Sequence, residues 1–293
     1  MRLKTVSEEL KNRYGEKVYR LSLSSGCTCP NRDGSIGFGG CTFCSEGGSG
    51  EFAASPAPIS VQIEEAKRLI REKTKAEKFI AYFQSYSNTY GPVDRLKALF
   101  EETIARDEIV ILDIGTRPDC LPPEMIELTK ELNEIKPVWV ELGLQTIHEN
   151  TAARIHRGYP LRVFEKAYHE LKAAGITVIV HVMLGLPGET KQDMLETVEY
   201  LSELEPILDG IKLHLLQILK GTQLAREYAE NPFPIMSLEE YGELLIRCLK
   251  LLKPGTVIHR ITGDGPKRLL IAPLWCGDKK HVLNTLNQMI REA

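Results

Sequence analysis

The sequence predicts an α/β protein built on a parallel sheet, and three observations support this class. Short β-branched runs alternate with longer helical patterns along most of the chain, which gives six consecutive βα units. The candidate strands are apolar almost throughout, as expected for strands that are covered on both faces. Polar and glycine-rich residues follow each strand, where ligands bind in parallel α/β folds. Six such units can form an open twisted sheet or a barrel, complete or partial.

The elements follow one another in a regular order. We predict strands at residues 18–24, 78–85, 108–115, 138–145, 176–185 and 210–219. We predict helices at residues 59–75, 92–107, 122–135, 161–175, 190–204 and 237–252. Two of the helices start with capping-box spacing, Thr190 with Asp193 and Ser237 with Glu240. The rest of the chain consists of a polar insert at 220–236, a candidate seventh strand at 256–263 and a C-terminal helix at 279–291.

No linker or low-complexity stretch divides the chain, so we predict one domain. Its core is expected to span residues 1–219, with a long loop at 25–58 between the first strand and the first helix. Such a long loop is uncommon unless it is functional. Residues 220–293 are expected to be a C-terminal extension packed on the same domain.

The composition fits a globular protein and excludes two classes. Of the 293 residues, 43% are hydrophobic and 26% are charged, and no apolar run reaches the ~18 residues that a membrane helix needs. The first residues are polar and do not form a secretion signal, so we expect a cytoplasmic protein. The net charge of −3 disfavours a strongly basic nucleic-acid binder but allows a local basic patch.

The stretch "CTCPNRDGSIGFGGCTFC" at 27–44 holds four of the seven cysteines. Disulfides are disfavoured in a reducing compartment. A structural zinc site commonly uses four ligands in two CxxC-like pairs, and only one such pair is present. A thioredoxin-type pair would not need Cys29. Three cysteines on one loop at the sheet's ligand-binding edge favour an iron–sulfur cubane with one open iron over zinc, and the glycines let the loop turn around it.

Several motifs together resemble those of radical S-adenosylmethionine (SAM) enzymes. They are "CPNRDGSIGFGGCTFC", "YFQSYSNTY", "GTRPDC", "ELGLQT", "IHRGY", "HVMLGLPGET" and "KLHLLQ". The usual loop of these enzymes is C-x3-C-x2-C. The eleven-residue first gap resembles the branch of YtqA- and YhcC-type proteins, which is related to the Elongator catalytic subunit. The resemblance implies a partial (β/α)6 barrel. Cys29, Cys41 and Cys44 match the cluster ligands, and Cys27 is expected to be a neighbour.

The resemblance implies two cofactors, a 4Fe–4S cluster and S-adenosylmethionine. The reduced cluster would cleave S-adenosylmethionine to a 5′-deoxyadenosyl radical, which abstracts hydrogen from the substrate. The expected cofactor-binding residues are Phe43 near the adenine, Gln84, Ser85 and Asn88 at the methionine amino group, Glu141, Gln145 and His181 at the ribose, Arg157 at the carboxylate and Gly185 near the adenine.

Each of these residues also has a purely structural interpretation. Phe43 can pack within its loop, and residues 84–88 can serve a turn. His181 can be a satisfied core histidine, and Arg157 can be a solvated surface residue. Lys212 and His214 share one face of the sixth strand, where they either line the substrate cavity as catalytic residues or face solvent.

For the substrate, the resemblance suggests tRNA, with conversion of a wobble carboxymethylaminomethyl-uridine to aminomethyl-uridine. It also implies an electron donor such as flavodoxin or ferredoxin, and a partner methyltransferase. The candidate phosphate contacts are Arg154, Arg157, Arg162, Lys220, Arg260, Lys267 and Arg268. One alternative is a radical enzyme acting on a small metabolite or a peptide. Another is a non-catalytic iron–sulfur or zinc protein that binds RNA.

Overall fold

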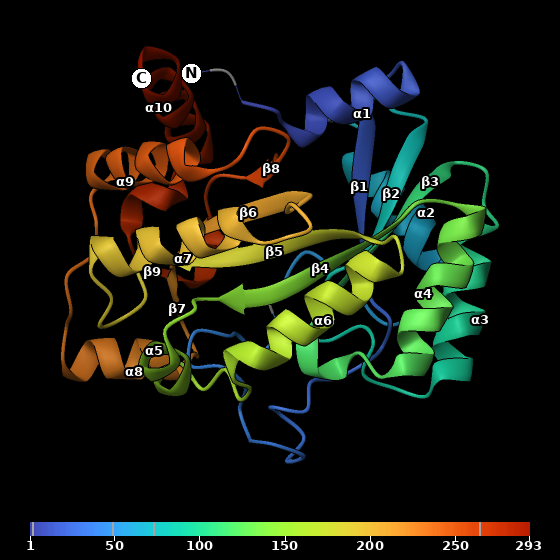
Figure 1. Cartoon of the computed structure of the whole chain (residues 1–293), viewed down its shortest axis with the longest axis horizontal. Helices are drawn as coiled ribbons and strands as arrows, with labels where there is room; N and C mark the ends of the chain where they lie inside the picture. Colours follow the sequence, from blue (N-terminus) through green and yellow to red (C-terminus); the bar gives the residue numbers. More distant parts are fainter. Residues whose placement is uncertain (2, 49, 73, 264) are drawn as a thin grey trace.

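The computed structural model describes residues 1, 3–48, 50–72, 74–263 and 265–293. The predicted helix at 59–75 and the loops at 25–58 and 259–268 are thus described except for one position in each. Seven parallel strands form one sheet in the order β1-β2-β3-β4-β5-β6-β8 (Figure 1). They are β1 (Val18–Leu23), β2 (Lys78–Phe83), β3 (Ile109–Thr116), β4 (Val138–Gln145), β5 (Thr177–Leu184), β6 (Gly210–Leu215) and β8 (Val257–Arg260).

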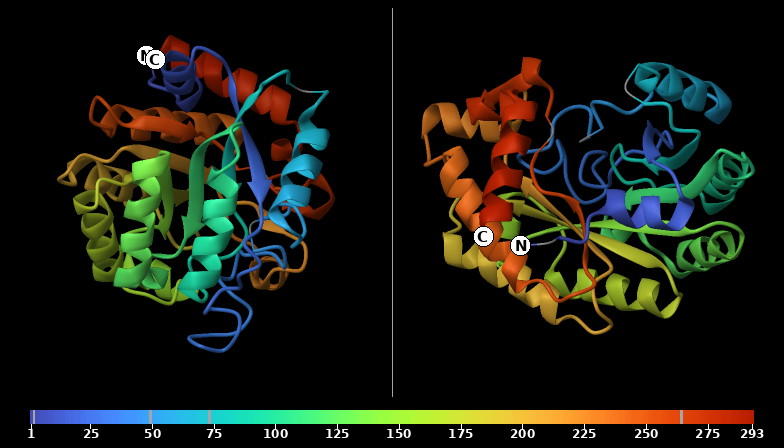
Figure 2. Two further views of the ribbon diagram at one scale, coloured as in Figure 1. Left: turned by 90° about the vertical axis from the view of Figure 1, so that its right-hand side faces the viewer. Right: turned by 90° about the horizontal axis from the view of Figure 1, so that it is seen from above.

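The strand order explains why the sheet curls into a partial barrel. Successive strands are neighbours throughout, so right-handed crossovers all place their helices on the same face. The other face lines the interior, as the view from above shows (Figure 2). The predicted partial barrel and its seventh strand are confirmed. The helices are α1 (Val6–Tyr14), α2 (Ile59–Ile70), α3 (Val93–Ile104), α4 (Pro123–Ile135), α5 (Glu149–Arg154), α6 (Leu161–Ala173), α7 (Lys191–Glu203), α8 (Gln223–Glu230), α9 (Leu238–Leu251) and α10 (Lys279–Glu292).

Local sequence signals set the ends of several helices. Both predicted capping boxes are present, at Thr190 with Asp193 on α7 and at Ser237 with Glu240 on α9. A third box, which the sequence analysis did not predict, joins Thr5 and Glu8 at the start of α1. No helix in the described residues is long and apolar enough to cross a membrane.

Two predicted segments differ from the structure, and two helices were not predicted. The predicted strand at 210–219 ends at Leu215, and residues Ile218–Leu219 form β7, which pairs antiparallel with β9 (Leu270–Ala272). The insert at 220–236 contains α8, which Thr222 caps. Helices α1 and α5 were not predicted. The pairing of β7 depends on a strand 50 residues away, so local patterns could not show it.

The two ends of the chain meet beside the last strand. The amino group of Met1 donates to the carbonyl of Ile290 at 3.0 Å, and Thr5 forms a parallel bridge with Ile258 of β8. The views agree that the termini lie side by side (Figure 2). Helix α1 thereby packs against the amino end of the barrel, where Leu10 contacts an apolar cluster that includes Ile80 and Trp139.

The inward-facing side chains change in kind along the strands, because alternate residues of a strand share a face. Near the amino ends the interior is apolar, with Ile80, Ile111, Trp139 and Ile179. Two positions further along the strands, the inward-facing residues form a group that we call the charged layer. Its members are Arg20, Tyr82, Asp113, Glu141, His181 and Lys212. Two residues beyond it the cavity opens, with Gln84, Gly115, Gly143, Met183 and His214 on its wall.

Candidate active site

A cavity lies at the carboxyl ends of the strands, where the sequence predicts the ligand site. Two surfaces enclose it. The loop side comes from the segment after β1 and includes Cys29, Arg32, Cys41, Phe43 and Cys44. The strand side comes from the inward-facing residues of the sheet, among them Gln84, Glu141, Gln145, His181, Lys212, His214 and Arg260.

The three predicted ligand cysteines lie together on the loop side and Cys27 does not. Cys29, Cys41 and Cys44 are partly exposed to the cavity. The backbone turns tightly at both ends of the set, since Arg32 N–H donates to Cys29 O at 2.8 Å and Cys44 N–H to Cys41 O at 2.9 Å. Cys27 is buried outside the cavity wall, where its Sγ accepts from Arg95 Nη2 at 2.9 Å.

The three sulfurs do not all lie within 4.8 Å of one another, which is wider than a single zinc ion requires. Zinc–sulfur bonds of about 2.3 Å place thiolates of one tetrahedral site less than about 4 Å apart. Within the described residues, the one group of three metal-ligating side chains with all ligand atoms inside 4.8 Å is elsewhere, at His148, Asp193 and Glu196. A cubane spaces its thiolates more widely, because each binds a different iron.

Glycine at position 40 is required by the fold of the loop. Its φ is +86°, and an added Cβ would lie 2.8 Å from Arg32 Nε. Arg32 passes under this turn, with Nη2 donating to the carbonyls of Cys44, at 3.1 Å, and Ser45. The loop is thus folded around an arginine beside the cysteines.

Two arginines place positive charge next to the cysteines, and the sequence analysis named neither. Arg32 stacks on Tyr86 at 5.5 Å and pairs with no carboxylate in the described part of the chain. Arg117 is paired with Asp119, through Nε to Oδ1 at 2.9 Å and Nη2 to Oδ2 at 2.7 Å. Burial raises the pKa of the Cys41 thiol to about 12, and the charge of Arg117 opposes this rise. Metal ligation would displace that proton.

Of the residues predicted at the methionine amino group, only Gln84 lines the cavity. Asn88 is fully buried, and its amide donates to the carbonyls of Phe83, at 2.9 Å, and Gly115, at 2.8 Å. Its Oδ1 accepts from Ser25 Oγ at 2.7 Å. Ser85 is also buried, against Gly50 of the loop. We therefore correct both assignments to roles that hold the loop on the sheet.

Gln145 is the predicted residue best placed to bind a ligand. It ends β4 with φ +71°, a conformation that costs a non-glycine residue free energy. Its side chain lies on the cavity wall, and its Oε1 is shielded from solvent without a hydrogen-bond partner among the described residues. A buried, unpaired amide oxygen is costly unless a ligand donates to it.

Of the two residues predicted near the adenine, Phe43 lines the cavity and Gly185 does not. Phe43 is half-buried on the cavity wall and, like Met183, packs against the apolar cluster that includes Ile155 and Leu216. The φ of Gly185 is +94°, and its N–H points to Met194 Sδ at 3.2 Å, so we reassign it to the turn that joins β5 to α7.

Arg157 lines the cavity, but its guanidinium is already bonded. It is 1% exposed and donates to the carbonyls of Tyr159 at 3.0 Å, Leu144 at 3.2 Å and Thr146 at 2.5 Å. It also pairs with Glu149 at 3.4 Å and stacks on Tyr159 at 4.7 Å. The predicted roles at a carboxylate or at RNA phosphate are corrected, because Arg157 holds the loop after β4.

The charged layer is a buried ion network below the cavity. Glu141 Oε2 accepts from Tyr82 at 2.6 Å, contacts His181 Nε2 at 2.7 Å and bonds the Lys212 ammonium. Arg20 lies 3.1 Å from Asp113 Oδ2 and 3.3 Å from Glu141 Oε1. These bonds occupy most of the polar atoms of Glu141 and Lys212, so the ribose contact predicted for Glu141 would have to compete with them.

Burial and neighbouring charges shift the titration of this layer in opposite directions. Burial lowers the pKa of Lys212 to about 7, and the charge of Glu141 offsets part of that effect. Burial opposes ionisation of Glu141, but Lys212 and Arg20 outweigh it and hold its pKa well below the usual value. Burial and the charge of Glu141 raise the pKa of Asp113 well above the usual value. Glu141 is therefore the ionised member of the two acids.

The sequence analysis missed Arg20, Tyr82 and Asp113. A charged residue inside an apolar strand was the available signal, and "VILDIG" carries it as clearly as "VWVELG" does. Lys212 and His214, predicted to share a face, both line the cavity. The imidazoles of His214 and His181 lie 5.1 Å apart, and His214 Nε2 has no hydrogen-bond partner within the described chain.

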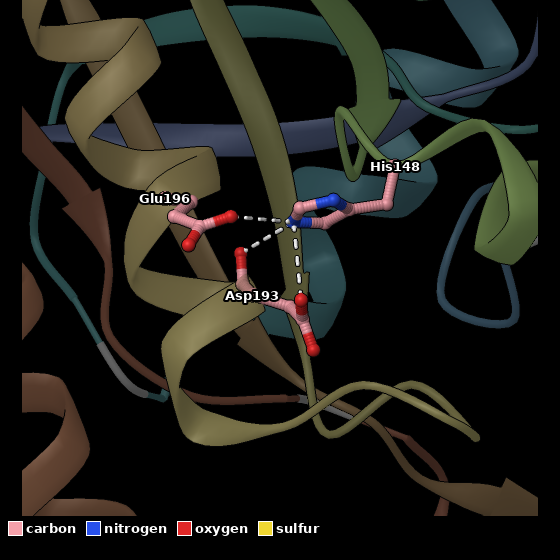
Figure 3. Close-up of side chains that lie close together, drawn as sticks. All are labelled: His148, Asp193 and Glu196. Carbon is pink, nitrogen blue, oxygen red and sulfur yellow. Dashed lines mark hydrogen bonds and ion pairs between the residues drawn. The ribbon is translucent and has the colours of Figure 1, made fainter.

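A second group of metal-ligating residues lies on the outer surface, where α5 begins beside α7 (Figure 3). His148 Nε2 is 3.9 Å from Asp193 Oδ1 and 3.8 Å from Glu196 Oε2. However, Nε2 already bonds the carbonyl of Asp193 at 2.9 Å, and Asp193 Oδ2 accepts from Thr190 in the capping box. These bonds explain the group as helix packing, and we assign it no metal.

Comparison with known proteins places this geometry in context. The model of the radical SAM superfamily matches residues 25–201, and that of the radical SAM C-terminal domain matches residues 208–292. Protein YtqA of Bacillus subtilis is 41% identical over 98% of this chain and 89% of its own length. Protein YhcC of Escherichia coli is 35% identical over 97% of this chain and 91% of its own length.

More distant proteins share part of the chain or the fold. Human Elongator complex protein 3 is 27% identical over 54% of this chain and 29% of its own length. The solved structure of the archaeal Methanocaldococcus infernus Elp3 superposes with a TM-score of 0.66 at 18% identity, over 79% of this chain and 59% of that one. The superposition on the archaeal Elp3 structure supports the partial-barrel fold.

Proposed function

The chain belongs to the radical SAM superfamily, and from this we propose that it holds a 4Fe–4S cluster on Cys29, Cys41 and Cys44 and acts on tRNA. The observation that carries the proposal is one cavity with two complementary walls. Three cysteines occupy the loop side, and Gln145 presents an unpaired amide oxygen from the strand side. When bound, the cluster and S-adenosylmethionine would supply a 5′-deoxyadenosyl radical.

The residues of this chain position and shield that chemistry. Gln145 and Gln84 offer polar contacts to S-adenosylmethionine, and Phe43 with Met183 offers an apolar surface for its adenine. The charged layer and the apolar residues beneath it close the amino end of the barrel. Water can therefore reach the cavity from the carboxyl ends of the strands, where the substrate would cover it, and through the opening between β1 and β8.

The proposed substrate is a wobble uridine of tRNA, carboxymethylaminomethyl-uridine, which would become aminomethyl-uridine. The likeness to Elongator complex protein 3 supports a tRNA substrate. Arg154, Arg162, Lys220, Lys267 and Arg268 are all exposed and remain candidate phosphate contacts. A flavodoxin or ferredoxin would donate the electron, and a methyltransferase would consume the amine product.

Two experiments test the proposal at separate levels. Anaerobic reconstitution with iron and sulfide should give a 4Fe–4S absorption and reductive cleavage of S-adenosylmethionine. Failure of both would refute the radical chemistry. For the substrate, tRNA nucleosides from a deletion strain should accumulate carboxymethylaminomethyl-uridine, and wild-type protein but not Cys41→Ala should reverse this. An unchanged nucleoside profile would refute the tRNA substrate alone.

A further inference from the structure

Arg260 is a cation of the cavity that has no acidic partner among the described residues. Arg260 ends β8 and lines both the main cavity and a second opening between β8 and β1. Arg20 bonds Asp113 and Glu141, and Lys212 bonds Glu141. In contrast, Arg260 makes no hydrogen bond or ion pair within the described residues, although it is only partly exposed. Within the described residues, Arg260 is therefore a cation of the cavity without a carboxylate of its own.

The sheet register places a second unpaired group beside Arg260. Arg260 is the register partner of Lys212, and Lys212 is the partner of His181. His214 follows Lys212 by two residues and so lies on the same face, one step nearer the cavity mouth. Its Nε2 is shielded from solvent without a partner in the part of the chain that the structure describes. Burial and nearby His181 hold the pKa of His214 well below its usual value, so the neutral ring offers one N–H.

We propose that Arg260 and His214 form a binding site for a carboxylate of the substrate, on the wall opposite the cluster cysteines. The assignment rests on the proposed function, because it names the part of the substrate that this wall would hold. A guanidinium can donate hydrogen bonds to both oxygens of a carboxylate, and a neutral imidazole N–H can donate to one of them.

The donor set favours a carboxylate over a phosphate. One guanidinium and one imidazole N–H match the two oxygens of a carboxylate. A phosphate monoester would bring close to two negative charges near Glu141, which is already ionised. In the proposed carboxymethylaminomethyl-uridine, this site would hold the carboxylate away from the loop side. The carbon atoms next to the carboxylate would then face the cofactors.

The test is a nuclear magnetic resonance titration of the reconstituted protein, labelled at the histidine rings, with acetate and with inorganic phosphate as probes. His214→Gln identifies the His214 signal. We expect acetate to shift that signal saturably at millimolar concentration. Arg260→Gln should weaken acetate binding at least tenfold, and Arg247→Gln, on the exposed face of α9, should not change it. Circular dichroism of Arg260→Gln checks that the variant is folded.

Each other outcome overturns the assignment. If acetate leaves the His214 signal unchanged, or binds equally well to Arg260→Gln, no carboxylate site exists there. If phosphate binds more tightly than acetate through Arg260, the site takes phosphate. Since the probes require no tRNA, an acetate site that persists with an unchanged tRNA profile refutes the tRNA substrate only. Normal tRNA modification without acetate binding refutes the carboxylate site only.

Discussion

The two walls of the cavity are built on opposite principles. The loop side presents three cysteine thiols, held by backbone turns, that can ligate a metal cluster. Most of the strand side is already paired with itself, because Glu141 bonds Tyr82 and Lys212 and forms an ion pair with Arg20. The loop side should therefore carry activity at little cost in stability, whereas the charged layer should carry much of the stability of the barrel interior.

The strongest test of this contrast is removal of a ligand cysteine. Cys41→Ala should abolish cluster assembly, measured by iron content and absorbance, because a cubane with two thiolates on this loop is not held. The free energy of unfolding of the cluster-free protein should change by less than about 1 kcal/mol. Cys29→Ala and Cys44→Ala should behave in the same way.

Cys27→Ala is the matched control. It should lower stability but leave cluster assembly intact, the opposite of the result expected for Cys41→Ala. Its sulfur is buried and bonded by Arg95, so the variant should lose about 1–2 kcal/mol of stability. It should nevertheless assemble the cluster. A Cys27→Ala protein without iron would show that the assignment of three ligands is wrong.

The strand side should respond to Lys212→Met with a large loss of stability. The substitution removes the closest cation from buried Glu141, and breaking a buried ion pair typically costs about 3–5 kcal/mol. The double variant Lys212→Met/Glu141→Gln should recover much of that loss, because no unpaired charge remains. Urea denaturation measures both. Equal stability of the single and double variants would show that the pair is not coupled.

Gln145, on the strand side, is expected to affect ligand binding and protein stability in opposite directions. Gln145→Gly removes the unpaired amide and relieves the positive φ, so stability should rise by about 1 kcal/mol. Affinity for S-adenosylmethionine, measured by calorimetry, should fall about tenfold, as for loss of one hydrogen bond. His156→Gly also relieves a positive φ, at an exposed position outside the cavity. That control should gain stability with unchanged affinity.

The same contrast explains how far sequence reasoning could reach. The loop side is encoded locally, so the cysteine spacing, the position of the loop after the first strand and the family resemblance together predicted that Cys29, Cys41 and Cys44 share one wall. The strand side was predictable only in part. Period two placed Lys212 and His214 on one face, but the partners of Lys212 come from β2 and β4. Nothing local indicates which strand's acid will meet which strand's lysine.

Two corrected residues show the same limit. Asn88 sits in a polar segment that resembles a ligand-binding loop, yet its amide is used by carbonyls of β2 and β3. Arg157 resembles a solvated or ligand-binding arginine, yet three carbonyls take its donors. In both cases the deciding hydrogen bonds join residues that only the folded sheet brings together.

The smallest expected effect concerns the charges around the cysteines. Arg32 is not neutralised by a carboxylate in the described residues, and Arg117 is neutralised by Asp119. Reduction adds a negative charge to a bound cluster, so a nearby net positive charge raises its reduction potential. Arg32→Gln should therefore lower the potential, and Asp119→Asn should raise it, each by several tens of millivolts.

A redox titration followed by electron paramagnetic resonance measures both shifts on the reconstituted protein. The opposite signs provide the control, because general damage to the loop would move both variants in the same direction. Arg32→Lys keeps the charge but loses the planar contacts with Tyr86 and the carbonyl of Cys44. Its potential should stay near that of the wild type if charge dominates. A shift as large as that of Arg32→Gln would assign the effect to loop geometry instead.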